Sequence, residues 1–182
     1  YAGRQRGGKG LLGWIPKLPW RDVSVTPQIL AGVLFIFGGI GGITNASYNI
    51  NLVIHNTVWI PGHLHLTVGT AVTLSFMGIT YWLLPHITGR KLWGRKVALW
   101  QAWTWFIGMI IFSNAMHVLG LLGAPRRTPL GMAPYVPQEW SGRLIQEGLG
   151  GSILFFGAYM FIVIVAVTAF AKQKAPAEQQ VH

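Results

Sequence analysis

The sequence predicts an all-α integral membrane protein with four transmembrane helices, and two observations lead to this fold class. Of the 182 residues, 52% are hydrophobic and only 10% are charged. Lys, Arg, Asp and Glu are absent from three long stretches, Val23–Gly89, Val97–Pro125 and Gly148–Ala171. A membrane-spanning helix needs roughly 20 apolar residues, so the first stretch has room for two spans and the others for one each. We expect a single membrane domain over residues 1–182.

The predicted helices follow one another along the chain. They cover about Gln28–Ile50, Pro61–Pro85, Val97–Leu122 and Gly148–Ala171. Glycines at Gly38–Gly42 in the first helix favour the close approach of a neighbouring helix. An Asn-rich polar loop is expected around Asn45–Asn56, and Pro61 with Gly62 marks the start of the second helix. The fourth helix has an aromatic, apolar sequence that indicates packing or lipid contact.

The basic residues predict how the helices cross the membrane. With four spans, three basic segments lie on one side, and they contain Arg4, Arg6, Lys9, Lys17, Arg21, Arg90, Lys91, Arg95, Lys96, Lys172 and Lys174. Only Arg126, Arg127 and Arg143 lie on the other side. Cytoplasmic loops are enriched in Lys and Arg, so we expect both termini in the cytoplasm and the loops 51–60 and 123–147 outside. The net charge of +10 therefore reflects membrane topology, and we expect no nucleic-acid partner.

The composition excludes several kinds of chemistry. The absence of Cys excludes disulfides, thiolate metal ligands and a Cys nucleophile. The sequence has no Gly-rich phosphate loop, no catalytic triad and no HExxH zinc motif. The acids Asp22, Glu139, Glu147 and Glu178 all lie outside the predicted helices, so we expect no carboxylate within the membrane to relay protons.

His63 and His65 stand near the outer end of the second predicted helix. Residues i and i+2 of a helix are roughly 200° apart, at about 100° per residue, so the two imidazoles should point to opposite sides. Ionisable groups inside a membrane are costly and usually functional, although water or carbonyl groups near the interface could also satisfy these rings. Because neutral imidazole is a common axial ligand of haem iron, the spacing indicates two haems, one on each side of a single helix.

Haems bound at this depth could extend their propionates to the outer surface, where we expect cations. Arg126 and Arg127 form an adjacent pair in the outer loop, and guanidinium groups bind carboxylates bidentately. His55 and Asn56, on the same side, could hydrogen-bond the propionates or hold a metal. The alternatives are solvent or lipid contact for the arginines and a simple turn for His55-Asn56. For His117, near the outer end of the third helix, we expect a packing role.

Two sequence motifs resemble signatures of a known family. The run His55-Asn56-Thr57-Val58-Trp59-Ile60-Pro61-Gly62-His63-Leu64-His65 is similar to a signature in subunit I of haem–copper terminal oxidases. A second signature is similar to Ala124-Pro125-Arg126-Arg127, preceded by His117-Val118-Leu119-Gly120-Leu121. The separation of the two motifs also fits the family. The resemblance covers all four helices and implies that they correspond to the last four of a twelve-helix core.

The resemblance implies a role for each motif residue. His63 would be the catalytic residue, as proximal ligand of the high-spin haem where oxygen is reduced. His65 would be one of two axial ligands of the low-spin haem, which feeds electrons to the high-spin haem. Arg126 and Arg127 would neutralise haem propionates, and His55 would lie near those of the high-spin haem.

Asn56 departs from the pattern of many family members, which have Asp at this position and bind Mg²⁺ there. A neutral amide is a weaker ligand for a hard dication, so we do not expect a Mg²⁺ site. Asn56 remains a candidate for cofactor binding. Together with Trp59 and Pro61-Gly62, it resembles the B-type branch of the family.

The resemblance implies an enzyme, a cytochrome c oxidase that reduces O₂ to water with electrons from cytochrome c and couples this reaction to proton translocation. Its partners would be the rest of subunit I and a copper-carrying subunit II, in a prokaryotic plasma membrane. The family's copper-ligating histidines, its cross-linked tyrosine and the second low-spin haem ligand lie upstream of the matched stretch. We therefore expect a C-terminal fragment or one part of a split subunit, inactive in isolation, with the copper centre completed by residues outside this chain.

Three alternatives stay open. Two lie within the superfamily: a nitric oxide reductase-like protein, or an oxidase that takes electrons from quinol. The third is a non-catalytic membrane haem-binding protein, which would need a second ligand for each haem, and only His117 could help to supply one.

Overall fold

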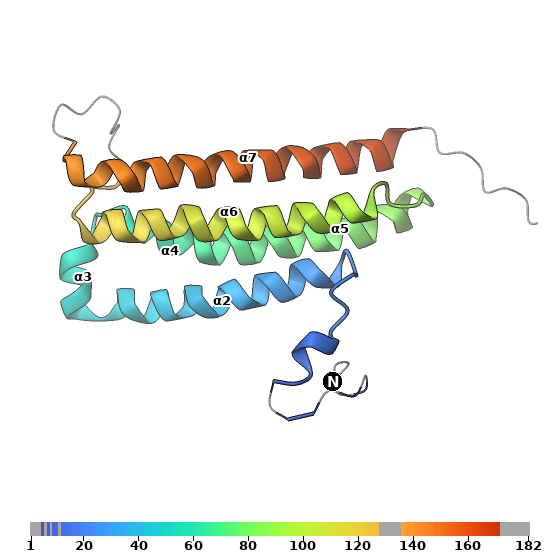
Figure 1. Cartoon of the computed structure of the whole chain (residues 1–182), viewed down its shortest axis with the longest axis horizontal. Coiled ribbons are helices and arrows are strands. Elements are labelled where there is room, and N and C mark those ends of the chain that lie inside the picture. Colours follow the sequence, from blue (N-terminus) through green and yellow to red (C-terminus); the bar gives the residue numbers. More distant parts are fainter. Residues whose placement is uncertain (1–4, 6, 8, 11, 128–135, 172–182) are drawn as a thin grey trace, which may run out of the picture.

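The structure is a bundle of long, nearly parallel and antiparallel helices (Figure 1). This computed structural model describes residues 5, 7, 9, 10, 12–127 and 136–171, and every regular element among them is a helix. Four basic residues counted in the topology prediction, Arg4, Arg6, Lys172 and Lys174, lie outside the described residues, as does Glu178, one of the four acids.

Three long helices lie beside a composite one. The three are α2 (Val25–Ala46), α6 (Arg95–Leu121) and α7 (Ser141–Phe170). The composite helix joins α4 (Trp59–Leu66), the π-helical segment η2 (Thr67–Val72) and α5 (Thr73–Thr88). Short elements complete the fold: η1 (Ile15–Lys17), α3 (Tyr48–Ile54) and η4 (Gln138–Trp140).

Four helical stretches are long and apolar enough to cross a membrane, judged by length and composition. They are Val25–Ala46, Trp59–Thr88, Arg95–Leu121 and Gln138–Phe170. The predicted all-helical fold with four spans is therefore confirmed.

The Asn-rich segment after the first span is helical, so the prediction of a polar loop around Asn45–Asn56 is wrong over most of its length. The first helix ends at Ala46, because Ser47 has an extended backbone, and α3 begins at Tyr48. The side chain of Asn51 donates to the backbone oxygen of Asn45 at 2.8 Å and so closes the corner between α2 and α3. Asn is unfavourable inside a helix because its side chain bonds to the backbone, and here that bonding joins two helices.

The last helix begins at Ser141 rather than at Gly148. Glu147 consequently lies in the second turn of α7 and is half-buried, and Glu139 lies in η4, so the prediction that all four acids lie outside helices is wrong for these two residues. The charge-free stretch Gly148–Ala171 predicts the apolar part of this span. The helical backbone of α7 begins earlier, because charged side chains at a helix end do not interrupt the backbone hydrogen bonds.

The bundle is held together by apolar contacts and by close approaches at glycine. One core cluster joins α2, the second span and α6 through Leu30, Ala31, Ala71, Leu74, Met77 and Ala102. The fully buried Tyr81 hydroxyl donates to Gln101 Oε1 at 2.8 Å across α5 and α6. Helix α7 comes so close to α6 that a Cβ atom at Gly150 would lie 2.7 Å from the Phe112 nitrogen. Small residues at such crossings allow membrane helices to pack tightly.

The π-helical segment η2 follows directly after His65 and Leu66. A wider helical turn leaves some carbonyl groups without their usual partners, and side chains bond to two of them. Thr70 Oγ1 donates to the His65 oxygen at 2.8 Å, and Trp105 Nε1 from α6 donates to the Gly69 oxygen at 3.0 Å. π-Helical turns occur frequently at functional sites, so η2 marks this part of the span as a candidate.

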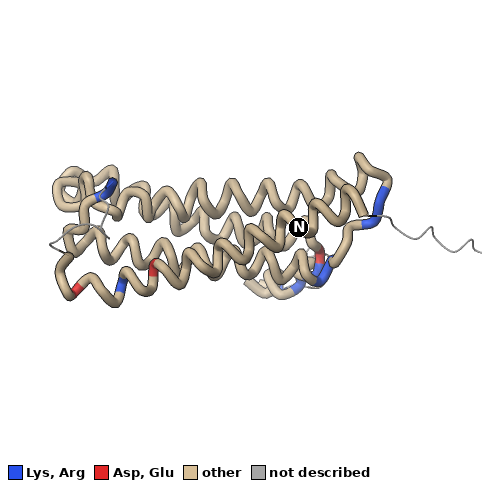
Figure 2. Tube along the Cα trace, turned by 90° about the horizontal axis from the view of Figure 1, so that it is seen from above, with Lys and Arg blue, Asp and Glu red and all other residues tan. Residues whose placement is uncertain are grey.

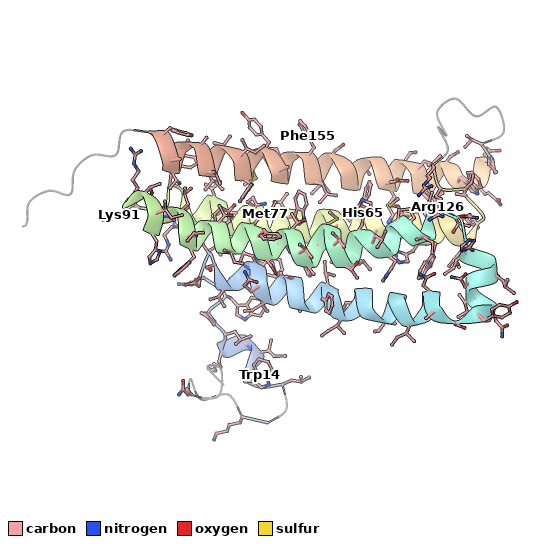
Figure 3. The ribbon with its side chains drawn as sticks, turned by 180° about the vertical axis from the view of Figure 1, so that it is seen from behind. Trp14, His65, Met77, Lys91, Arg126 and Phe155 are labelled. Atoms are coloured by element: carbon pink, nitrogen blue, oxygen red, sulfur yellow. The ribbon has the colours of Figure 1, made fainter. Side chains whose placement is uncertain are left out.

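Charged residues gather at the two ends of the bundle, and the long helical midsections carry almost none (Figure 2). Lys91, in the turn between α5 and α6, and Arg126, beyond the end of α6, lie at opposite ends (Figure 3). Phe155, 76% exposed, projects from α7 away from the bundle. The molecule therefore has apolar sides and polar ends, as a membrane protein requires.

Candidate functional site

Helix α4 directs two imidazoles toward different neighbours. The His63 ring lies against α2, where Cβ atoms added at Gly41 and Gly42 would be 3.0 Å from its Nδ1 and 3.5 Å from its Cε1. The His65 ring lies on the side of α6, with its centroid 5.0 Å from that of Phe112. The two rings therefore contact different neighbouring helices, and their orientation on opposite sides of the helix stays a prediction.

The His65 ring is held in a defined orientation by the turn that precedes it. Its Nδ1 is 2.6 Å from the backbone oxygen of Pro61. A carbonyl oxygen can only accept, so Nδ1 must carry the proton, and Nε2 then keeps its lone pair. Metal-binding histidines commonly use one ring nitrogen in this way, which orients the other nitrogen for ligation. This hydrogen bonding makes His65 a candidate axial ligand of haem iron.

The surroundings of His63 differ from those of His65. Its Nδ1 is buried and has no hydrogen-bond partner among the residues that the structure describes. Its ring stacks on Trp59, with centroids 6.0 Å apart and planes inclined by 18°. Gly41 has no side chain, so the ring lies directly against the backbone of α2. An orphaned buried nitrogen costs roughly 1–3 kcal/mol, which marks this ring as a ligand candidate.

A cavity of about 430 Å³ lies beside Trp59, between α2 and α6. Its walls include Gly41, Ser113 and His117. His117 Nδ1 is 2.7 Å from the Ser113 oxygen, and its ring meets Trp59 edge-on with centroids 4.9 Å apart. The hydrogen bond and ring contact agree with the packing role predicted for His117, and the ring also borders the cavity.

Helix α6 is tied to the backbone immediately before the first histidine of the pair. The buried Ser113 hydroxyl donates to the Gly62 oxygen at 2.7 Å. A Cβ atom at Gly62 would lie 3.0 Å from the Met116 Cβ, and one at Gly120 would overlap the backbone of Trp59. These close approaches hold the first turns of α4 against α6, so the position of the histidine pair depends on both helices.

Two loops, 70 residues apart in sequence, meet at one end of the bundle. Arg126 Nη2 donates to Asn56 Oδ1 at 2.8 Å, and the Arg126 amide donates to the Asn56 oxygen at 2.9 Å. Thr57 and Pro125 form an isolated antiparallel bridge beside them. Asn56 and Arg127 both have left-handed backbones, with φ of 63° and 62°. This conformation is unfavourable for Arg, and such strain clusters at functional sites.

The predicted site residues are thus only partly brought together. Asn56 and Arg126 are bonded to each other, whereas His63 and His65 lie against different helices. The side chains of His55 and Arg127 are exposed at the same end of the bundle as Arg126. Within the described part of the chain, neither of these two side chains hydrogen-bonds to Asn56 or Arg126, so their expected roles near propionates stay predictions.

Several residues near the histidines were not predicted from the sequence. Trp59 and Phe112 contact one ring each, and Glu147 on α7 lies in the neighbourhood of His65. Trp59 lies in the motif, but nothing in its spacing indicates a stacking role. Phe112 and Glu147 are far from the motif in sequence, and only the packing of α6 and α7 brings them near it.

The donors present fit axial haem ligation better than a metal site made by protein alone. Among the described residues, no group of three or more His, Cys, Asp or Glu side chains could hold a metal ion. Haem needs only one or two protein ligands, because the macrocycle supplies the rest. His65 offers an Nε2 oriented by the contact of its Nδ1, and His63 has a ring packed against the glycines of α2.

Comparison with known sequences and structures identifies similar proteins. Residues 8–153 match the family described as "Cytochrome C and Quinol oxidase polypeptide I". Cytochrome c oxidase subunit 1 of Thermus thermophilus is 39% identical over 178 residues, which cover 97% of this chain and 32% of the relative. The probable quinol oxidase subunit 1 of Staphylococcus haemolyticus is 30% identical over 176 residues, covering 94% of this chain and 25% of the relative.

The fold has a counterpart among solved structures. A cryo-EM structure of a heme-copper terminal oxidase dimer matches with a TM-score of 0.77 and 36% identity, covering 84% of this chain and 28% of the other. The chain therefore spans about a third of the length of the Thermus relative. The resemblance predicted from the two motifs is confirmed, and the assignment to the B-type branch stays a prediction.

Proposed function

Because the chain belongs to the cytochrome c and quinol oxidase polypeptide I family, we propose that it supplies two axial haem ligands to a respiratory terminal oxidase. That enzyme would reduce O₂ to water with electrons from cytochrome c and couple the reaction to proton translocation across a prokaryotic plasma membrane. The observation that carries the proposal is the placement of His63 against α2 and of His65 against α6. One helix could thereby offer one imidazole to each of two haems, because the two rings have different neighbours and would not bind the same iron.

Each histidine has a separate role in this proposal. His65 ligates the low-spin haem through Nε2, because Nδ1 is engaged with the Pro61 oxygen. His63 would ligate the high-spin haem, and its ring lies against α2, where Gly41 and Gly42 make room for it. Bound haem supplies iron that accepts and donates single electrons. The chain holds the two rings at fixed positions away from water, because α4 packs closely against α6.

The outer loops would bind the haem propionates. Arg126 and Arg127 provide guanidinium groups for carboxylates, with Asn56 already bonded to Arg126 and His55 exposed beside it. Joining the loops places an amide and a guanidinium in one cluster before any propionate is bound. The amide at Asn56 is a poor ligand for Mg²⁺, so we propose no magnesium at this position.

Other parts of the complete enzyme would have to supply the rest of the chemistry. The copper centre, the second ligand of the low-spin haem and a copper-carrying subunit II would come from residues outside this chain. We propose that residues 1–182 alone reduce no oxygen. The basic end of the bundle would face the cytoplasm, with both termini on that side.

Single substitutions in the assembled complex test the two ligand roles. His65→Ala should abolish the optical signal of the low-spin haem, whereas His63→Ala should abolish CO binding to the reduced high-spin haem. His86→Ala is the matched control, because His86 is exposed on α5 at the other end of the span and bonds only to the Trp82 oxygen among the described residues. Identical spectral losses from the two ligand variants would refute separate ligation.

Quinol is a second candidate for the electron donor. The observation in its favour is the 30% identity to a probable quinol oxidase subunit 1. Stopped-flow reduction of the complex by cytochrome c and, separately, by a short-chain ubiquinol distinguishes the donors. Reduction by quinol alone would replace cytochrome c in the proposal and leave the haem ligands unchanged.

A further inference from the structure

At the end of the bundle opposite to Arg126, a second cavity has three basic side chains among apolar and neutral polar lining residues. It has a volume of about 530 Å³ and lies between the segment before α2, the end of α5 and the start of α6. Its lining includes the side chains of Asp22, Trp82, His86, Arg90, Lys91 and Arg95. Lys91 in Figure 3 marks its position. The proposed haem ligands lie in the other half of the second span, so this cavity belongs to a different site.

The charges around this cavity favour an anion. Arg90, Lys91 and Arg95 contribute three positive charges, against one carboxylate from Asp22. That carboxylate already accepts two hydrogen bonds, from the amides of Ser24 at 2.9 Å and Val25 at 3.0 Å. The carboxylate is therefore engaged with the amides at the start of α2. With three positive charges against one negative charge, the cavity keeps a net positive charge.

Two further features hold the basic groups in place and add to the positive potential. Arg90 Nη1 donates to the Ala171 oxygen at 2.9 Å, which anchors this side chain between α5 and the end of α7. A guanidinium has five N–H donors, so this bond leaves others for a ligand. Arg95 is the first residue of the 27-residue helix α6, whose cap at Gly94 provides no side-chain hydrogen bond. The amides at such a helix start attract anions.

Tryptophans place the cavity at the depth of lipid headgroups. Trp82 is 54% exposed and Trp93 is 43% exposed, and both lie at this end of the bundle. The Trp82 ring packs on His86 with centroids 4.4 Å apart. Tryptophan concentrates where the hydrocarbon core meets the headgroups, so a ligand of this cavity would be reached from the membrane interface.

We propose that this cavity binds the phosphate headgroup of one anionic phospholipid, with phosphatidylglycerol as the simplest example. Arg90 and Arg95 bind the phosphate, Lys91 adds charge, and the acyl chains lie along the exposed apolar side of α5. Basic pockets between membrane helices are known to take anionic headgroups. Free phosphate offers the same chemistry, but the interfacial tryptophans favour a ligand that is part of the membrane.

Native mass spectrometry of the purified complex tests the proposal. The complex is stripped of loosely held lipid by detergent exchange and titrated with phosphatidylglycerol, with phosphatidylcholine or with inorganic phosphate. Arg95→Gln and Arg90→Gln should each weaken binding of one phosphatidylglycerol about fivefold. Lys96→Gln is the control, because it removes the same charge from the adjacent residue of α6, whose side chain lines a different groove with Trp100. This variant should bind as tightly as the parent.

Each outcome decides the proposal. Selective weakening in the two arginine variants, with no comparable uptake of phosphatidylcholine, supports a headgroup site. Equal weakening in Lys96→Gln would overturn it, because surface charge alone would then explain the binding. Displacement of the lipid by millimolar inorganic phosphate would also overturn it, in favour of a free-anion site. The measurement counts bound lipid and does not depend on haem, so it is independent of the proposed oxidase function.

Discussion

Replacing Gly41 with Ala should disturb the His63 site, whereas the same replacement at Gly42 should not. A Cβ atom at Gly41 would lie 3.0 Å from the His63 Nδ1, closer than ordinary contact. At Gly42 the nearest atom of that ring would be Cε1, at 3.5 Å, which is ordinary van der Waals distance. Both changes raise helix propensity by roughly 0.5–1 kcal/mol, so the difference between the two variants isolates the contact with the ring.

The size of that difference follows from how the ring can respond. The backbone of α2 is rigid, and Trp59 stacks on one side of the imidazole. The ring must therefore rotate away from its preferred side-chain torsion, and a rotation of about 30° costs roughly 0.5–1.5 kcal/mol. That cost corresponds to a loss of roughly 2- to 13-fold in the affinity of any ligand that needs the original orientation.

The assay is a CO titration of the dithionite-reduced complex, followed by the CO difference spectrum in the Soret region. Gly41→Ala should lower CO affinity or the fraction of CO-reactive haem, while Gly42→Ala should match the parent. The low-spin haem spectrum serves as an internal control, because the His65 ring lies against α6. Equal behaviour of the two variants, or a larger defect in Gly42→Ala, would refute the reasoning.

Three more substitutions test other contacts of the site. Ser113→Ala removes the buried hydrogen bond to the Gly62 oxygen and should destabilise the complex by about 1 kcal/mol in thermal unfolding. The control is Ser152→Ala, which removes an exposed hydrogen bond on α7 and should have little effect. Equal losses of stability in the two variants would contradict a role for the Ser113 bond. Trp105→Phe removes the hydrogen bond to the Gly69 oxygen in the π-helical segment and should shift the absorption band of the low-spin haem. Trp100→Phe is the control, because Trp100 is 71% exposed. An unshifted band in Trp105→Phe would argue against coupling between η2 and His65. Arg126→Ala should lower a haem midpoint potential, because loss of a cation beside a propionate favours the oxidised iron. Redox titration of the complex measures this potential. An unchanged value would count against the proposed contact between Arg126 and a propionate.

Much of the fold could be predicted because its causes are local. Charge-free stretches of sufficient length identify the spans, and the helical period of about 100° per residue predicts that His63 and His65 point to opposite sides. Arg126 and Asn56 were expected on one side of the membrane, since four spans determine which loops share a side. These inferences need only the order of the residues and the geometry of a helix.

The remaining features depend on contacts between distant segments. Nothing in Thr67–Val72 indicates a π-helix, because one of its stabilising donors is Trp105 on another helix. The bond between Asn56 and Arg126 joins loops 70 residues apart. Glu147 lies beyond the charge-free stretch, and only the helical continuation of α7 brings it near His65. Hydropathy predicts which part of a span is apolar, and it does not predict at which residue the helix begins.

The π-helical segment separates the second span into two halves that can be oriented independently. An α-helix turns by about 100° for each residue, so one extra residue in a wide turn changes the angle between the face of α4 and the face of α5. The upstream half can then present the imidazoles to their two sides, while the downstream half keeps Tyr81 on Gln101. A one-residue deletion within Thr67–Val72 would restore a uniform helix and rotate one half against the other. The orientation of the two histidines and the packing of the opposite end are thus separate properties of one continuous helical span.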